Sequence, residues 1–133
     1  MKLSANILVV DDDIAMLELI AYSLRRAGHK ATTASNWDDV VNQINQANQA
    51  GKPFDLFVLD LMMPGRSGYD MLRSLKVILH PMPPVIILSA LSGIDDAVKA
   101  LELGAVKYLT KPTTPDRLLM TVREALRTTS KGY

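Results

Sequence analysis

The sequence has 133 residues, of which 48% are hydrophobic and 22% charged, so it can form one ordinary domain with a sizeable apolar core. Its formal net charge is only +1 and it contains no cysteine. These values exclude disulfides, thiolate catalysis and cysteine metal sites. They also give no electrostatic reason to expect direct binding of nucleic acid or of an anionic membrane.

The first apolar segment, Ile7–Val10, is too short for the core of a signal peptide. No later apolar segment approaches the length of a membrane span. The absence of cysteine also fits a reducing compartment. We therefore expect a soluble, cytoplasmic protein.

Five short, largely apolar segments predict five β-strands. Ile7–Val10 and Val85–Leu88 show no polar alternation, so both faces of these strands must be covered, as in a parallel sheet between two helical layers. The predicted strands are Ile7–Val10, Lys30–Ala34, Phe54–Leu59, Val85–Leu88 and Ala105–Leu109.

Each strand is followed by a segment with helical periodicity. Asn36 and Thr114 are predicted to cap the N-termini of the second and fifth helices, and Gly28 to end the first. Ser67 lies near the predicted start of the third helix. Five strands alternating with five helices predict an α/β fold, a doubly wound (βα)5 sandwich. We expect a single domain at residues 1–128 and a flexible tail at 129–133. The helical patterns consist of Leu17, Ile20, Ala21 and Leu24, then Leu72, Leu75 and Leu79, then Ile94, Val98 and Leu101, and finally Leu118, Leu119, Val122 and Leu126.

Polar residues follow four of the predicted strands, and the carboxyl ends of parallel strands meet at one edge of a sheet. Two carboxylates about 4 Å apart repel by roughly 4 kcal/mol at an effective dielectric near 20, so clustered acids need a shared proton, a lysine or a bound cation. An all-oxygen site suits Mg²⁺, which would also screen an incoming phosphoryl group. Asp13 is instead expected to cap the first helix or face solvent. The strand-end residues are Asp11, Asp12 and Asp13, then Asp60, Ser89 and Lys111.

From Ile7 to about Leu126 the sequence resembles the receiver domain of bacterial two-component response regulators. The resemblance implies a flavodoxin-like fold with a five-stranded parallel sheet in the order 2-1-3-4-5. It also implies a phosphoacceptor switch that catalyses only its own phosphorylation and dephosphorylation, and not a metabolic enzyme. The matching motifs are Val9-Val10-Asp11-Asp12, Asp60-Leu61-Met62-Met63-Pro64-Gly65 with Gly68, Leu88-Ser89-Ala90, Gly104-Ala105, and Tyr108-Leu109-Thr110-Lys111-Pro112.

The resemblance also implies a role for each matching residue. Asp60 would accept the phosphoryl group from a sensor histidine kinase, a histidine phosphotransfer protein or a small donor such as acetyl phosphate. Mg²⁺, with Mn²⁺ as the alternative ion, would be bound by Asp12, Asp60 and the backbone carbonyl of Met62, and by Asp11 through a water molecule. Lys111 would pair with Asp60 and then with a phosphoryl oxygen.

Ser89, which precedes Ala90, would hydrogen-bond another phosphoryl oxygen, and Tyr108 would swing inward behind it. This movement would switch the surface of the fourth helix, fifth strand and fifth helix, which could bind a downstream partner or form a homodimer. The family has a cis peptide before Pro112. Thr113 stands where the family usually has Phe, so docking of the fifth helix is expected to differ locally.

The family's hydrolysis-tuning positions are Met62 and Leu91, both apolar, which predicts a slowly decaying phosphoryl state. Two forms of the protein stay open: a complete regulator that acts by protein–protein contact, or a receiver from a longer transcription factor or hybrid kinase.

Two other functions are found on similar sheets. In a haloacid-dehalogenase-like, Mg²⁺-dependent phosphohydrolase, Asp11 would be the nucleophile and Asp13 the acid. Against this, Ala15 stands where that motif has Thr or Val, and Asp60 is left without a role. A flavin-binding domain would need a phosphate cradle after the first strand, where three aspartates would repel the phosphate.

Overall fold

The computed structural model describes residues 4–63 and 65–131, with side chains described as far as residue 127. Pro64 of the predicted motif lies outside the described residues. Strands and helices alternate as predicted. The strands are β1 (Asn6–Val10), β2 (Lys30–Ala34), β3 (Leu56–Leu59), β4 (Val85–Ser89) and β5 (Lys107–Thr110), and the helices are α1 (Ile14–Arg26), α2 (Trp37–Gln49), α3 (Gly68–Ile78), α4 (Ile94–Glu102) and α5 (Pro115–Lys131).

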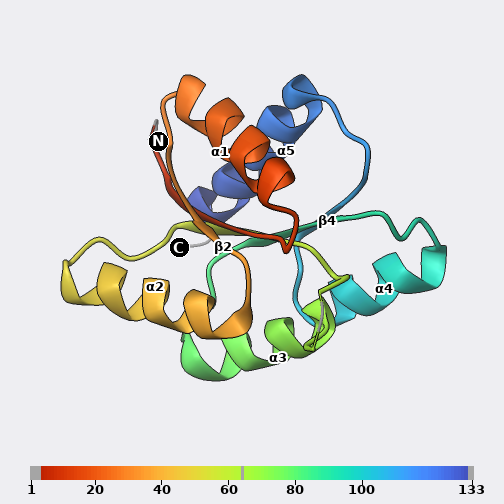
Figure 1. The fold of residues 1–133 in the computed structure, drawn as a ribbon, viewed down its shortest axis with the longest axis horizontal. Helices are drawn as coiled ribbons and strands as arrows, with labels where there is room; N and C mark the ends of the chain where they lie inside the picture. The colour runs from red at the N-terminus through yellow and green to blue at the C-terminus, as the bar shows by residue number, and fades with distance from the viewer. Residues whose placement is uncertain (1–3, 64, 132–133) are drawn as a thin grey trace.

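All neighbouring strands are parallel, in the order β2-β1-β3-β4-β5. Helices α1 and α5 cover one face of the sheet, and α2, α3 and α4 cover the other (Figure 1). The predicted fold class and strand order are therefore confirmed.

The covering of both faces explains why the inner strands lack polar alternation. In β1, Leu8 and Val10 pack in the cluster beneath α2, α3 and α4, whereas Ile7 and Val9 pack in the cluster beneath α1 and α5. All four side chains are at most 2% exposed. Because successive side chains of a strand point to opposite faces, an all-apolar strand contributes to two cores at once.

The caps predicted at Asn36 and Thr114 are present, and the structure adds Ser67 as the cap of α3. The side-chain oxygens of Asn36, Ser67 and Thr114 accept hydrogen bonds from backbone N–H groups three residues later, at 2.9, 3.2 and 3.1 Å. Gly28 follows the end of α1 with φ of 97°, a conformation that favours glycine. These local signals therefore place the helix termini.

Several boundaries differ from prediction. β3 begins at Leu56 and β5 at Lys107, each two residues later than predicted, and α5 continues to Lys131, into the segment predicted as a flexible tail. The helical pattern of α4 does not mark a buried face, because Ile94, Val98 and Leu101 are 81%, 44% and 48% exposed. This helix lies beside the edge strand β5 and buries only Ala100 among its residues. Within the described chain, no helix is long and apolar enough to span a membrane.

Candidate functional site

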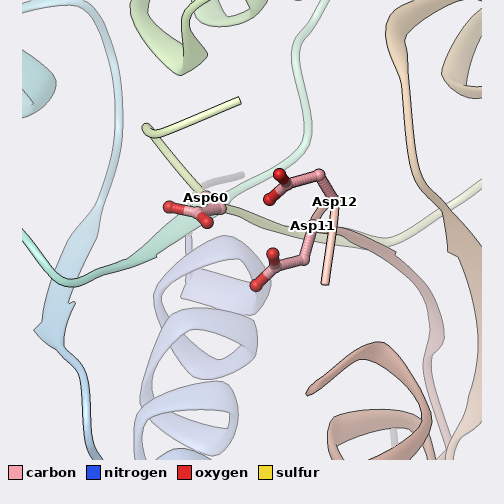
Figure 2. A group of neighbouring side chains, drawn as sticks. All are labelled: Asp11, Asp12 and Asp60. Carbon is pink, nitrogen blue, oxygen red and sulfur yellow. The ribbon is translucent and has the colours of Figure 1, made fainter. Parts of the chain in front are cut away.

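Three carboxylates meet where two neighbouring strands end. Asp11 and Asp12 follow β1 and Asp60 follows β3, and these strands are paired in register, Val10 opposite Leu59. One oxygen atom from each carboxylate lies within 4.8 Å of the others. Figure 2 shows the three side chains together at this edge of the sheet. Asp11 and Asp60 are 2% and 6% exposed, whereas Asp12 is exposed. The cluster therefore consists of two buried carboxylates and one that is accessible to solvent.

Local backbone hydrogen bonds orient the two buried carboxylates. Asp11 Oδ1 accepts from the backbone N–H of Asp13, and Asp60 Oδ1 accepts from the backbone N–H of Met62, both at 3.0 Å. Each is a turn in which an aspartate binds the backbone two residues on. The Oδ2 atom of each carboxylate is thereby left to face the lysine that follows β5.

Lys111 joins these two carboxylates. Its Nζ donates to Asp11 Oδ2 at 2.6 Å and to Asp60 Oδ2 at 3.2 Å. The backbone N–H of Lys111 also donates to the carbonyl of Ser89 at 2.7 Å, which ties the end of β5 to the end of β4. The resemblance predicted pairing with Asp60, and the structure adds Asp11 as the nearer partner. Compensation of the acidic cluster by a lysine, one of three alternatives left open by the sequence, is thus present.

The protonation equilibria follow from this geometry. Burial raises the pKa of Asp60, while the Met62 N–H and the charge of Lys111 oppose the rise. Burial by itself would lower the pKa of Lys111. The hydrogen bond to Asp11 and the negative charges of Asp11 and Asp60 outweigh burial and raise it. The lysine therefore stays protonated at neutral pH.

The donor set fits a hard divalent cation. Its side-chain ligands are all carboxylate oxygens, two of them buried and one on the solvent side. Mg²⁺ and similar ions prefer oxygen ligands and keep part of their water shell, which an open, incomplete protein site allows. The carbonyl of Met62 belongs to the adjoining loop, and its role as a ligand stays a prediction.

The other predicted residues lie around the fourth strand end. Ser89, the last residue of β4, is fully buried, and its Oγ accepts from the backbone N–H of Leu91 at 3.2 Å. The Tyr108 hydroxyl donates to the carbonyl of Leu91 at 2.6 Å, and burial raises the pKa of this tyrosine. Ala90, between them, is exposed. The β4–α4 connection is therefore in contact with both residues predicted to take part in switching.

Two features concern the segment after β5. The Lys111–Pro112 peptide is cis, as the resemblance implied. Among the described residues, the Thr113 hydroxyl is buried with no hydrogen-bond partner. The sequence marked Thr113 as a departure from the family pattern but carried no signal that its hydroxyl would be unpaired.

Asp13 has a different role from the cluster. Its side chain is exposed and accepts from the backbone N–H of Met16 at 3.2 Å, which caps α1 as expected. A phosphohydrolase of the alternative kind would need this carboxyl as its acid. With Asp13 at a helix cap and Asp60 in the cluster, the phosphohydrolase interpretation is not supported.

Comparison with known proteins agrees with the site. A family model described as the response regulator receiver domain matches residues 7–123. The chain is 34% identical over 127 residues to the phosphate regulon transcriptional regulatory protein PhoB of Escherichia coli, covering 94% of this chain and 53% of PhoB. It is 37% identical over 121 residues to the transcriptional regulatory protein ZraR of Klebsiella oxytoca, covering 91% of this chain and 26% of ZraR.

A solved response regulator receiver domain protein from Clostridium thermocellum is similar in structure. The TM-score is 0.82 at 32% identity, and the match covers 95% of this chain and 97% of that one. The chain spans about half the length of PhoB and about a quarter of ZraR. Together with the sheet order and the carboxylate cluster, these matches show that the chain belongs to the response regulator receiver domains, the phosphoacceptor switches of two-component signalling.

Proposed function

We propose that Asp60 accepts a phosphoryl group from the phosphohistidine of a sensor histidine kinase or of a histidine phosphotransfer protein. The observation that carries this proposal is the position of the Lys111 ammonium, 2.6 Å from Asp11 and 3.2 Å from Asp60 between two buried carboxylates. Once one Asp60 oxygen is bonded to phosphorus, the ammonium is placed to pair with a phosphoryl oxygen instead.

The transfer needs no separate base. An Asp60 oxygen attacks phosphorus and forms a P–O bond, while the P–N bond to the donor histidine breaks and its electron pair stays on the ring nitrogen. Burial raises the pKa of Asp60, but the Met62 N–H and Lys111 act to lower it, and these two groups therefore favour the ionised, nucleophilic carboxylate. Positioning and charge stabilisation then supply the rate, as is general for phosphoryl transfer.

A divalent cation, when bound, neutralises charge on the carboxylates and on the phosphoryl oxygens. Asp12 and Asp60 would hold it directly, together with the backbone carbonyl of Met62, and Asp11 would act through water. The oxygen-only donors favour Mg²⁺, with Mn²⁺ as the alternative. The same site would support autodephosphorylation. Because the tuning positions Met62 and Leu91 carry no group that can orient water, hydrolysis should be slow, and an intrinsic half-life of seconds in Mg²⁺ buffer would contradict this.

Switching would follow from the contacts on the β4–α4 connection. The Ser89 hydroxyl would give up its hydrogen bond with the Leu91 N–H and bind the phosphoryl group. The Tyr108 hydroxyl, which donates to the Leu91 carbonyl, would change position together with that loop. The surface of α4, β5 and α5 would report the change, because its exposed apolar residues Val98 and Leu101 offer contact area.

This surface is proposed to bind a downstream effector, a fused output domain or a second copy of the chain. PhoB and ZraR are named transcriptional regulatory proteins, which favours a transcriptional output in a longer protein. Direct contact with nucleic acid or membrane is not proposed for this domain, and a cytoplasmic location fits such a role.

Intact-mass spectrometry after incubation with acetyl phosphate and Mg²⁺ tests the proposal. The wild type should gain one phosphoryl group, Asp60→Ala should gain none, and omission of Mg²⁺ should abolish the gain. Asp11→Ala should slow the reaction by weakening the metal site, and Asp13→Ala serves as the matched control that keeps it. An adduct that survives Asp60→Ala would refute the assignment of the acceptor.

A further inference from the structure

The loop between β3 and α3 carries the phosphoacceptor and is closed tightly at its base. The backbone N–H of Gly68 donates to the carbonyl of Leu61 at 2.9 Å. A Cβ at Gly68 would lie 2.5 Å from Leu61 Cα and 2.6 Å from the Asp60 carbonyl oxygen, so only glycine fits. The two ends of the loop are thus held together by backbone contacts.

Among the described residues of the loop, Met63 is buried in the core cluster and Arg66, farther along, makes contacts with two helices. Its guanidinium carbon lies 4.8 Å from the centroid of the Trp37 ring, at the start of α2. Its Nη2 donates to the hydroxyl of Ser74, in the middle of α3. All three side chains are partly buried. Arg66 therefore joins the loop to two helices, α2 and α3.

This placement is specific in its chemistry. A planar guanidinium can lie against an indole and still direct N–H groups to an acceptor at its edge, which an ammonium cannot do. Among the described residues, Arg66 Nε is buried without a hydrogen-bond partner. The contact between the guanidinium and the Trp37 ring therefore forms even though one N–H donor loses its water. No described carboxylate forms an ion pair with Arg66, so its partners are the ring and the hydroxyl.

The loop held in this way determines the geometry of the acceptor. The Met62 N–H orients Asp60 through its 3.0 Å hydrogen bond, and the Met62 carbonyl is the proposed third metal ligand. Metal and phosphoryl sites lose affinity when their donors are not held in place before binding. A side chain that limits the motion of the described residues of this loop would therefore limit the motion of these donors.

We propose that Arg66 is a positioning residue of the phosphoacceptor site, which acts by holding the β3–α3 loop against Trp37 and Ser74 and thereby preorganises the donors for a divalent cation. The proposal rests on the proposed function, because it assigns Arg66 to the same Mg²⁺ site. Arg66 itself is not proposed to touch the metal or the phosphoryl group.

Titration of the whole chain with Mg²⁺ by calorimetry, in parallel with fluorescence of Trp37, tests this proposal. Trp37 is the only tryptophan in the sequence, so its emission reports the stack directly. We expect Arg66→Ala to shift the emission and to raise the Kd for Mg²⁺ about threefold to tenfold. Arg66→Lys should give an emission and a Kd between those of wild type and Arg66→Ala, since lysine keeps the positive charge but lacks the planar guanidinium. Arg73→Ala, which removes an exposed α3 arginine paired with Asp70 at 2.9 Å, should change neither quantity.

A Kd within twofold of wild type for Arg66→Ala, with the emission shifted, would overturn the proposal and leave Arg66 as a structural contact only. If Arg66→Ala does not fold, Ser74→Ala removes the other end of the contact and should raise the Kd in the same direction. Failure of the proposed function is separate, because it would appear in the wild type as absence of Mg²⁺ binding and of phosphorylation at Asp60.

Discussion

Replacement of Lys111 by methionine tests the electrostatics of the cluster most directly. Methionine keeps much of the apolar stem of the side chain but removes the charge that lies 2.6 Å from Asp11 and 3.2 Å from Asp60. Breaking a buried ion pair costs about 3–5 kcal/mol, because the remaining charge is left unpaired. The Lys111 side chain is 18% exposed, so the pair is only partly buried and the expected loss is below that range, about 2–3 kcal/mol at pH 7.5 without divalent cations.

The loss should depend on pH with a definite sign. A carboxyl whose pKa is raised by folding binds its proton more tightly in the folded state, so it favours folding at low pH and loses that contribution as the pH rises through its folded pKa. Lys111 opposes the rise of the Asp60 pKa, so its removal raises that pKa further. The difference in unfolding free energy between wild type and Lys111→Met should therefore shrink as the pH falls from 7.5 toward 5.

Urea unfolding in the presence of EDTA and of saturating Mg²⁺ measures these effects. Mg²⁺ should stabilise Lys111→Met more than wild type, since the cation replaces the missing charge. Lys107→Met is the control, because Lys107 pairs with Glu124 at 3.7 Å with both side chains more than a third exposed. It should cost less than about 1 kcal/mol. A loss for Lys111→Met no larger than this control, or one unchanged by pH and Mg²⁺, would refute the reasoning.

Three further substitutions are predicted to change stability as measured by urea unfolding. Gly68→Ala places a Cβ 2.5 Å from Leu61 Cα, a backbone atom that cannot move aside, and should cost about 3 kcal/mol; a cost below about 1 kcal/mol would show that the loop adjusts. Thr113→Val removes a buried, unpaired hydroxyl and should stabilise by about 1 kcal/mol, whereas a loss would mean that the hydroxyl has a partner in solution. Asp13→Ala removes the cap on the Met16 N–H and should cost about 1 kcal/mol. It should leave phosphorylation by acetyl phosphate intact, and loss of the phosphoryl adduct would show that Asp13 takes part in the reaction.

Much of the fold follows from local patterns in the sequence. Unbroken apolar segments such as Val85–Leu88 require cover on both faces, and the caps at Asn36, Ser67 and Thr114 act within three residues of the helix start. The edge at which the acids gather follows as well, because parallel strands place all their carboxyl ends on one side. These inferences depend on interactions between residues close in sequence, or on the direction in which a strand runs.

Other features depend on how distant segments pack. Lys111 lies nearer to Asp11 than to Asp60, a relation across 100 residues that no spacing in the sequence encodes. Ile94 is exposed because α4 lies at the edge of the sheet. A 3.6-residue period indicates that a helix has an apolar face, but it does not indicate whether another element covers that face.

The sequence alone thus determined the elements, their order along the chain and the set of strand-end residues that carry the chemistry. Only the tertiary structure decided which of these side chains touch, as it did for the guanidinium of Arg66 and the ring of Trp37. The physical reason is that local patterns set the direction of each backbone segment. The distance between two side chains from different segments depends on the combined packing of everything between them.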